Sequence, residues 1–323
     1  MGTMKQAILV DRKKFEMRDV AIPTTGSDEV LVKVRASGVC ASELHAWQDG
    51  EDAPVALGHE VAGDIVAVGS NVTGFKVGDR VTGLFGEGFA DYAVEKADRV
   101  LHIPEAIPLE SAFGEPLACA VSAARRTHVE LGDRIAIVGL GFMGLLMLQL
   151  LQLKGPSEVL GIDLREEALQ RGKHFGCDIA LTPSQLPHHA HLAQFDVVVE
   201  ATGTQEGLSL ATELVRQHGV LSILGYHQGG PREVDMKLWN FKAIEVLNAH
   251  ERRADFRMDC MRRGLALAAA GKLDLQYLTT NSYGLDQVGD AFSDLASKPA
   301  GFIKAVLVSG PETDNPLSRI PDF

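Results

Sequence analysis

The sequence has few cysteines, and no two of them lie close together. Its four cysteines are widely separated along 323 residues, at Cys40, Cys119, Cys177 and Cys260. A disulfide framework and a four-cysteine structural zinc module both use closely spaced pairs, so we expect neither. The first residues also lack an apolar core of the length that a secretory signal needs. These absences predict a cytoplasmic protein.

Positive charge is also scarce. Lys and Arg total 31 against 43 Asp and Glu, which gives a net charge of −12. An acidic chain without a basic stripe is a poor candidate for binding nucleic acid or an anionic membrane. The uncharged run Ile135–Leu153 is about long enough to span a bilayer, but glycines interrupt it. We therefore expect no nucleic acid and no membrane partner, but a small molecule or further copies of the chain.

The middle of the chain alternates short apolar runs with helical stretches. Runs such as "RIAIVG", "EVLGID" and "DVVVEAT" are typical of buried strands, and they recur from Asp133 to about Asn248. This alternation predicts βαβ units and a parallel sheet with helices on both faces. Six such strands would complete a dinucleotide-binding sheet. An exposed edge strand such as "AIEVLN" invites pairing, so we expect a homodimer or homotetramer.

The first 110 residues have a different pattern. Short strands are punctuated by Gly, Asn and Asp, which predicts a compact and mostly antiparallel β domain. Residues 109–127 are helix-like, and "GLDQVGDAFSDLASKPAGFIKAVLVS" predicts a helix, a turn and a strand that return to the first domain. The expected fold class is α/β. A β-rich domain would comprise residues 1–122 and 281–323, and a doubly wound parallel sheet residues 123–280.

A glycine-rich turn follows the first strand of the predicted parallel sheet. In "GLGFMG", Gly139 permits a tight turn, Gly141 lets the backbone approach a pyrophosphate, and Gly144 lets the helix pack closely on the sheet. Asp163 ends the next strand, where a carboxylate accepts hydrogen bonds from ribose hydroxyls and repels a 2′-phosphate. NAD is therefore favoured over NADP, although Arg165 weakens this preference. The further residues that we expect to contact the cofactor are Phe142, Met143, Ala201 and Gly225.

Three short stretches contain side chains that zinc can bind. "GVCASELH" contains Cys40, "LGHEVAG" contains His59 and Glu60, and "FGEPLACA" contains Glu115. Thiolate, imidazole and carboxylate are zinc ligands, and a catalytic zinc needs three of them with one position open. Each stretch also has an ordinary interpretation: an inert thiol, a solvated surface pair, or a carboxylate at a helix start. These residues alone leave both interpretations open.

The order of the motifs resembles a known superfamily. "GVCASELH", "GHEVAGDIVAVGSNVTGFKVGDRV", "GEPLA", "GLGFMG" and "VVVEATG" occur as they do in zinc-dependent medium-chain dehydrogenases/reductases. The resemblance runs from about Lys5 to Val308 and is greater to the polyol (sorbitol-type) dehydrogenases than to the ethanol-oxidising ones. It implies a GroES-like catalytic domain, a Rossmann domain, one catalytic zinc per chain and NAD. It also implies hydride transfer between a secondary alcohol, of the polyol, sugar or cyclitol class, and the cofactor.

The resemblance also implies roles for individual residues. Cys40 and His59 match two zinc ligands, and Glu60 matches a glutamate that binds zinc directly in some members and lies behind the ligands in others. Glu115 matches the position where polyol-type enzymes have a glutamate that binds zinc or its water. Ser42 matches the hydroxyl that relays the substrate proton, and His45 matches a further relay group.

Some features depart from the family pattern or have no assigned role. The cysteine lobe that holds a structural zinc in other members is missing, so we predict no structural zinc. His227 and Lys304 are weaker candidates for approaching the nicotinamide and the cofactor phosphates, respectively. The three histidines of "PHHAH" (187–191) are expected in a solvated loop. Two alternative functions remain: a zinc-free NADPH-dependent quinone or enone reductase, and a non-catalytic nucleotide-binding protein.

Overall fold

The protein is described by a computed structural model that covers residues 2–50, 52–186 and 194–309. The chain divides into two compact units, one of Met1–Ala118 with Met261–Phe323 and one of Cys119–Cys260. The sequence placed the second boundary at 280/281, whereas helix α7 (Ala254–Ala269) runs through the observed one. The histidines of "PHHAH" and the polar tail beyond residue 309 lie outside the described residues.

The first unit is built from two sheets. A three-stranded sheet has the order β2-β1-β4, and a larger one has the order β15-β16-β3-β5-β6-β8, with β7 paired to β3. Apart from the parallel pair β15–β16, these strands pair antiparallel. The strand bounds are β1 Thr3–Asp11, β2 Lys14–Ala21, β3 Glu29–Gly38, β4 Val55–Ala56, β5 Glu60–Val68, β6 Arg80–Gly83, β7 Tyr92–Lys96, β8 Val100–His102, β15 Asn281–Gly284 and β16 Ala305–Val308.

The pairing of β3 with β5 determines which residues meet at one end of the larger sheet. The two strands run antiparallel, so the last residue of β3, Gly38, lies opposite the first residue of β5, Glu60. A side chain at position 38 would overlap the Glu60 carboxylate, which explains the glycine at that position. Residues just after β3 and just before β5 are therefore neighbours in space.

Helices and aromatic side chains complete the first unit. Helix α8 (Val288–Ser297) buries Phe292, whose ring lies 5.3–5.9 Å from the rings of Phe15, Trp47 and Phe89. This cluster joins α8, the short helix α1 (Leu44–Asp49) and the small sheet in one core. Helix α2 (Gly114–Arg126) begins in this unit and crosses the first boundary. Because β16 pairs with β3, the C-terminal segment belongs to the same sheet as the N-terminal strands.

The second unit contains a six-stranded parallel sheet in the order β11-β10-β9-β12-β13-β14. This is the strand order of a doubly wound sheet with its switch point between β9 and β12, which confirms the predicted α/β class. The strands are β9 Arg134–Val138, β10 Glu158–Ile162, β11 Ile179–Leu181, β12 Phe195–Glu200, β13 Val215–Ile223 and β14 Glu245–Asn248. The helices between them are α3 Phe142–Gln152, α4 Glu166–His174, α5 Gln205–Leu214 and α6 Met236–Lys242.

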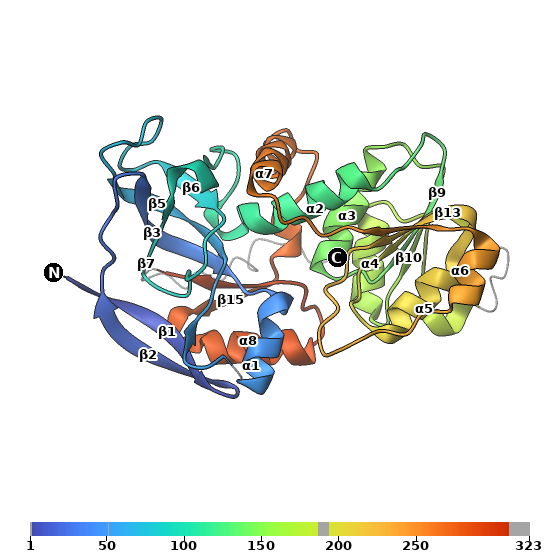
Figure 1. The fold of residues 1–323 in the computed structure, drawn as a ribbon, viewed down its shortest axis with the longest axis horizontal. Coiled ribbons are helices and arrows are strands. Elements are labelled where there is room, and N and C mark those ends of the chain that lie inside the picture. Colours follow the sequence, from blue (N-terminus) through green and yellow to red (C-terminus); the bar gives the residue numbers. More distant parts are fainter. Residues whose placement is uncertain (1, 51, 187–193, 310–323) are drawn as a thin grey trace. The chain divides into compact units, whose positions relative to one another are not determined.

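Helices cover the parallel sheet in the second unit (Figure 1). Leu208, Ala211 and Leu214 of α5 pack with Ala136, Val138 and Leu160 of the sheet in one core. The uncharged run noted in the sequence is a strand, a turn and the 11-residue helix α3. None of the helices that the structure describes is long and apolar enough to cross a membrane.

Candidate metal centre and nucleotide site

The structure brings three of the predicted ligands together in the first unit. One ligand atom each of Cys40, His59 and Glu60 lies within 4.8 Å of the others. They meet because Cys40 follows the end of β3, while His59 immediately precedes β5 and Glu60 begins it, at the paired strand ends. A thiolate, an imidazole and a carboxylate at this spacing fit zinc better than magnesium or calcium, which prefer oxygen ligands alone.

His59 is held between two acidic groups. Its Nδ1 lies 3.0 Å from Glu43 Oε1, and the same oxygen accepts the backbone N–H of Gly58 at 2.7 Å. Burial lowers the pKa of His59, but hydrogen bonds with Cys40 and Glu43 outweigh it and raise the pKa to about 12. The surroundings thus favour one positive charge beside Cys40, which a metal cation would supply in place of the proton.

Glu43 is a residue to which the sequence analysis gave no role. It lies in the 3-10 turn before α1, and its side chain is only 8% exposed. A carboxylate that accepts a hydrogen bond from the far nitrogen of a metal-binding histidine fixes its ring and tautomer. The available signal was the carboxylate within "GVCASELH", three residues after Cys40.

Glu60 is paired with a buried lysine. Lys304, in the turn before β16, places its Nζ 2.7 Å from Glu60 Oε1 and 3.0 Å from the carbonyl oxygen of Val39. A further contact of 2.6 Å to Oε2 is an ion pair without hydrogen-bond geometry. Burial lowers the pKa of Lys304, whereas Glu60, Cys40 and Glu115 raise it, with a net upward shift. The lysine charge is therefore directed at Glu60.

The remaining predicted residues of the first unit lie outside the group of three. Glu115 is in the first turn of α2, and its charge helps to raise the pKa of Lys304. Ser42 donates a hydrogen bond from Oγ to Cys40 Sγ at 3.3 Å. His45 lies on α1 with 47% of its side chain exposed, and its Nδ1 is 2.7 Å from Asp49 Oδ2.

The glycine-rich turn lies where the sequence predicts it, between β9 and α3. Gly139 has a positive φ of 99°, and a side chain at Gly144 would overlap the carbonyl oxygen of Gly139. Asp163 follows β10, and its Oδ2 accepts the N–H of Leu140 at 2.9 Å. Its Oδ1 lies 3.2 Å from Arg165 Nε. The aspartate is therefore held against the turn, with the arginine beside it.

The other cofactor candidates lie at the carboxyl end of the parallel sheet. Phe142 and Met143 are half-buried in the first turn of α3. Ala201 follows β12 and donates its N–H to Val138, while Gly225 follows β13 and donates its N–H to Glu200. All lie beyond the carboxyl ends of parallel strands, which is where such sheets bind nucleotides.

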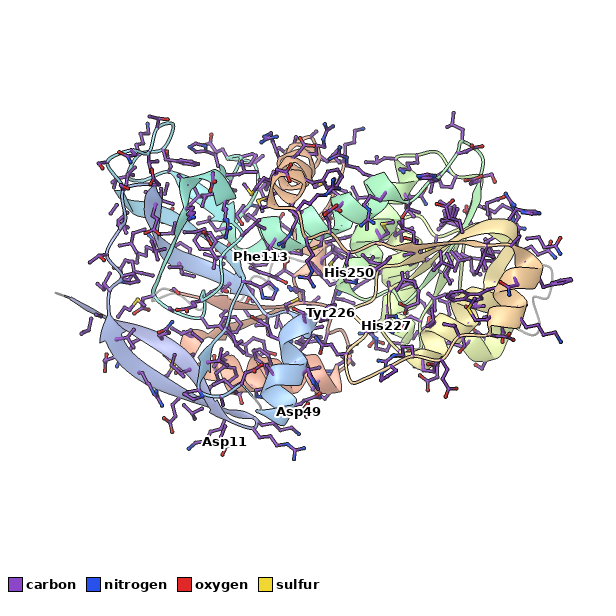
Figure 2. The ribbon with its side chains drawn as sticks, viewed as in Figure 1. Asp11, Asp49, Phe113, Tyr226, His227 and His250 are labelled. Carbon is purple, nitrogen blue, oxygen red and sulfur yellow. The ribbon has the colours of Figure 1, made fainter. Side chains whose placement is uncertain are left out.

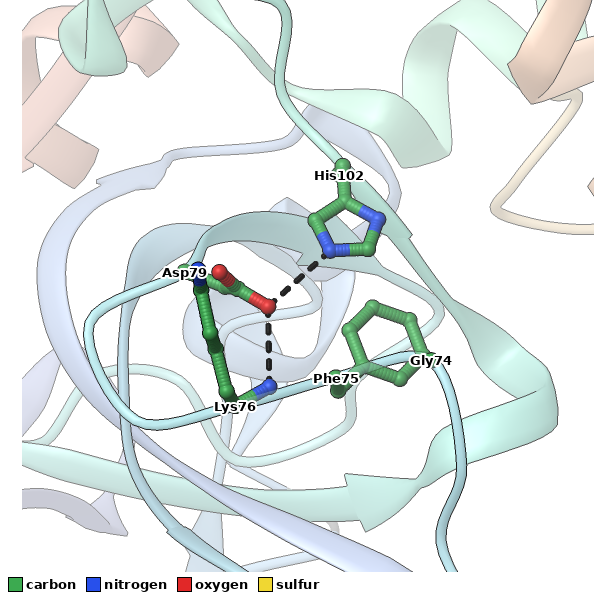
Figure 3. Close-up of a pocket in the computed structure, with 5 residues that line it drawn as sticks. All are labelled: Gly74, Phe75, Lys76, Asp79 and His102. Carbon is green, nitrogen blue, oxygen red and sulfur yellow. Dashed lines mark hydrogen bonds and ion pairs between the residues drawn. The ribbon is translucent and has the colours of Figure 1, made fainter.

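A surface hollow in the first unit contains none of the predicted site residues. Figure 3 shows its lining residues, Gly74, Phe75, Lys76, Asp79 and His102. His102 Nε2 lies 3.1 Å from Asp79 Oδ2, and its ring stacks on Phe75 with 4.6 Å between centroids. These contacts close the loop between β5 and β6, so we interpret the hollow as part of a loop anchor.

Two families match the chain. The alcohol dehydrogenase GroES-like domain matches residues 26–105, and the zinc-binding dehydrogenase family matches residues 143–263. Sorbitol dehydrogenase of Bacillus subtilis (strain 168) is 28% identical over 89% of this chain and 92% of its own. D-arabitol-phosphate dehydrogenase of Enterococcus avium is 27% identical over 96% and 98%. A solved structure from Sinorhizobium meliloti 1021, bound to NADP, has a TM-score of 0.84 at 27% identity over 96% and 100%.

The fold and the clustered ligands, taken with these matches, define a two-domain dehydrogenase. The chain belongs to the zinc-type medium-chain dehydrogenases/reductases, which confirms the resemblance drawn from its motifs. It is an oxidoreductase that acts on alcohols. The family and its NADP-bound neighbour support zinc and a nicotinamide nucleotide as its cofactors.

Proposed function

We propose that the protein oxidises a secondary alcohol of the polyol, sugar or cyclitol class with NAD, using one zinc per chain. The observation that carries this proposal is the convergence of Cys40, His59 and Glu60, with Glu43 behind His59. The names of the relatives, sorbitol and D-arabitol-phosphate dehydrogenases, support a hydroxyl-rich substrate. Aromatic residues, which could line an apolar pocket, make up only 6% of the chain, and this suits a polar substrate better than an apolar one.

Cys40 and His59 would hold the metal, and a glutamate would complete the set. Glu60 is already paired with Lys304, which favours Glu115 as the glutamate that binds the metal or its water while Glu60 stays behind the ligands. When bound, zinc supplies Lewis acidity that favours loss of a proton from a substrate hydroxyl, and the nucleotide supplies the hydride acceptor. Ser42, bonded to Cys40, would relay that proton by accepting it while its own hydroxyl hydrogen is passed on, and the exposed His45 would pass the proton to solvent.

The first test is a metal measurement on protein purified without a histidine tag or added metal. We expect one zinc per chain by elemental analysis, and NAD reduction with at least one member of a polyol panel. Cys40→Ser should lose both zinc and turnover. Cys177→Ser, a buried cysteine of the second unit, is the matched control and should keep both. If the purified protein contains no zinc and added zinc does not bind, the zinc-free quinone or enone reductase would become the favoured function.

The preference for NAD over NADP rests on Asp163. Its carboxylate lies against the glycine-rich turn and would repel a 2′-phosphate, whereas Arg165 beside it and the NADP-bound neighbour favour the alternative. Titration of the purified protein with NAD and NADP, followed by intrinsic fluorescence, decides between them. A lower Kd for NADP would contradict our proposal.

We also propose that the protein forms a dimer or tetramer through strand β14. In the part of the chain that the structure describes, β14 is an edge strand of the parallel sheet. Val246 on this strand is 37% exposed, and Phe241 nearby in the sequence is 74% exposed. Light scattering should give twice or four times the chain mass, and Val246→Lys should reduce it. The cytoplasmic location remains a prediction.

A further inference from the structure

A buried carboxylate lies at the end of β12, in the second unit and outside the metal centre. The Glu200 side chain is fully buried. Its Oε1 accepts the backbone N–H groups of Thr202 and Gly203 at 2.7 and 2.9 Å, and the hydroxyl of Thr202 at 2.5 Å. Its Oε2 lies 2.9 Å from His227 Nε2. A buried charge is costly unless it is fully hydrogen-bonded, so the Glu200 carboxylate depends on each of these hydrogen-bond partners.

The partners of His227 determine its tautomer. Arg232 Nε lies 3.1 Å from His227 Nδ1. A guanidinium has donors and no acceptor, so Nδ1 must accept and carries no proton. The proton is therefore on Nε2, where it is donated to Glu200. The imidazole is neutral and is fixed in both tautomer and ring orientation by an acidic partner on one side and a basic one on the other.

Arg232 also binds the backbone of the two loops that follow β12 and β13. Its Nη2 donates to the carbonyl oxygens of Gly203 at 3.2 Å and Gln228 at 2.5 Å, and its Nη1 donates to Gly230 at 3.1 Å. A guanidinium has a rigid fork of donors that lysine cannot reproduce. The side chain therefore joins the loop after β12 to the loop after β13.

A second histidine, just after the end of β14, stabilises the same loop. His250 Nε2 lies 3.2 Å from the carbonyl oxygen of Gly225, and its ring contacts that of Tyr226 at 5.5 Å. Figure 2 labels Tyr226, His227 and His250. Tyr226 is 50% exposed. A largely buried network thus presents one exposed side chain, Tyr226, between the buried Gly225 and the half-buried His227 at the carboxyl end of the sheet.

The place of this network in the sheet indicates its function. Asp163 and the glycine-rich turn lie at β9 and β10, on one side of the switch point, and the network lies at β12 and β13 on the other. A dinucleotide binds across the switch point, with one mononucleotide on each half. The half with Asp163 would receive adenosine, which leaves the half with His227 for the nicotinamide.

We propose that Glu200, His227 and Arg232 are positioning residues that fix the two loops for the nicotinamide half of the cofactor. This inference rests on the proposed binding of NAD. The neutral imidazole provides a rigid link between the loops and adds no charge near the cofactor. Loss of the link leaves the adenosine half intact, so its effect should be confined to ligands that carry the nicotinamide.

The test compares NAD with ADP-ribose, which lacks the nicotinamide. Kd values are measured by calorimetry for wild type, for His227→Phe and for the exposed His128→Phe as a matched control. We expect His227→Phe to raise the Kd for NAD about tenfold, roughly 1.4 kcal/mol, with the Kd for ADP-ribose changed less than about twofold. His227→Gln, which keeps an N–H donor for Glu200, should recover most of the affinity for NAD.

Each other outcome counts against the proposal. Equal losses for both ligands would indicate a general structural role, and no loss for either would remove the role altogether. A wild-type protein that binds neither ligand would instead overturn the proposed function. Where His227→Phe does not fold, ¹⁵N NMR of histidine-labelled wild type still decides: His227 should be neutral with its proton on Nε2. A proton on Nδ1 would overturn the assignment.

Discussion

The buried pair of Lys304 and Glu60 allows a direct test of the electrostatics of the candidate metal centre. In Lys304→Met, the Glu60 carboxylate, whose side chain is 1% exposed, loses the cation that lies 2.6 Å away. Removing one partner of a buried ion pair typically costs about 3–5 kcal/mol, because the other charge stays buried. Whole proteins have only about 5–15 kcal/mol of stability. The variant should therefore lose a large part of it.

The assay is urea unfolding of metal-free protein, because a bound metal would add its own stabilisation. In a unit of this size the loss corresponds to a fall in melting temperature of about 6–20 °C. Lys237→Met, an exposed lysine on α6, is the matched control and should change stability by less than about 0.5 kcal/mol.

A double variant separates charge pairing from simple loss of packing. Glu60→Gln removes the charge that Lys304→Met leaves unpaired, so the two changes together should cost less than their sum, by about 1–3 kcal/mol. Additive effects within about 0.5 kcal/mol would refute the reasoning. The two side chains would then contribute independently, whatever distance separates them.

Three further predictions concern other parts of the two units. Glu43→Gln should weaken zinc binding about 10- to 100-fold, because the hydrogen-bond partner of His59 loses its charge; competition with a chromogenic chelator measures this, and unchanged affinity would contradict the role. Asp163→Ser should lower the preference for NAD over NADP, which the ratio of their Kd values reports, and an unchanged ratio would locate discrimination elsewhere. Burial raises the pKa of Asp196, but hydrogen bonds from the Arg134 amide and the Arg216 guanidinium outweigh it and lower the pKa. Its stabilisation is therefore present above its unfolded pKa of about 3.9 and is lost as the pH falls through the lower folded value. In urea unfolding, Asp196→Asn should thus be less stable than wild type at pH 7, by an amount that falls as the pH is lowered below about 3.9; a constant difference would contradict the assignment.

Local patterns predicted much of the fold. The alternation of apolar runs and helices predicted the parallel sheet, and the glycine spacing placed the turn between β9 and α3. Both signals lie within a few tens of residues, where periodicity and turn chemistry decide the structure. Cys40, His59 and Glu60 could be named as candidates for the same reason: each lies at a recognisable strand end.

The contacts behind those candidates depend on distant parts of the chain. "GVCASELH" contains several polar groups, and only the pairing of β3 with β5 determines that Glu43 faces His59. Lys304 lies 244 residues from Glu60, and nothing in "GFIKAVL" indicates where its charge is directed. The compact units divide near residue 260, within α7, whereas the sequence analysis placed a domain boundary at 280/281; a helix has the same periodicity on both sides of such a division.

The long separation between Glu60 and Lys304 has a consequence for how the protein is made. A ribosome that adds about 5–20 residues per second completes residue 304 roughly 10–50 s after residue 60. During that interval β3 and β5 can already pair and bring Cys40, His59 and Glu60 together. The second unit is still being synthesised, and β16 has not yet joined β3. The nascent protein therefore contains the Glu60 carboxylate before its partner exists. Lys304 reaches Glu60 only when the adjacent strand β16 pairs with β3. The surroundings of the candidate metal centre are therefore completed only when Lys304 joins them, well after Cys40 and His59 have been synthesised.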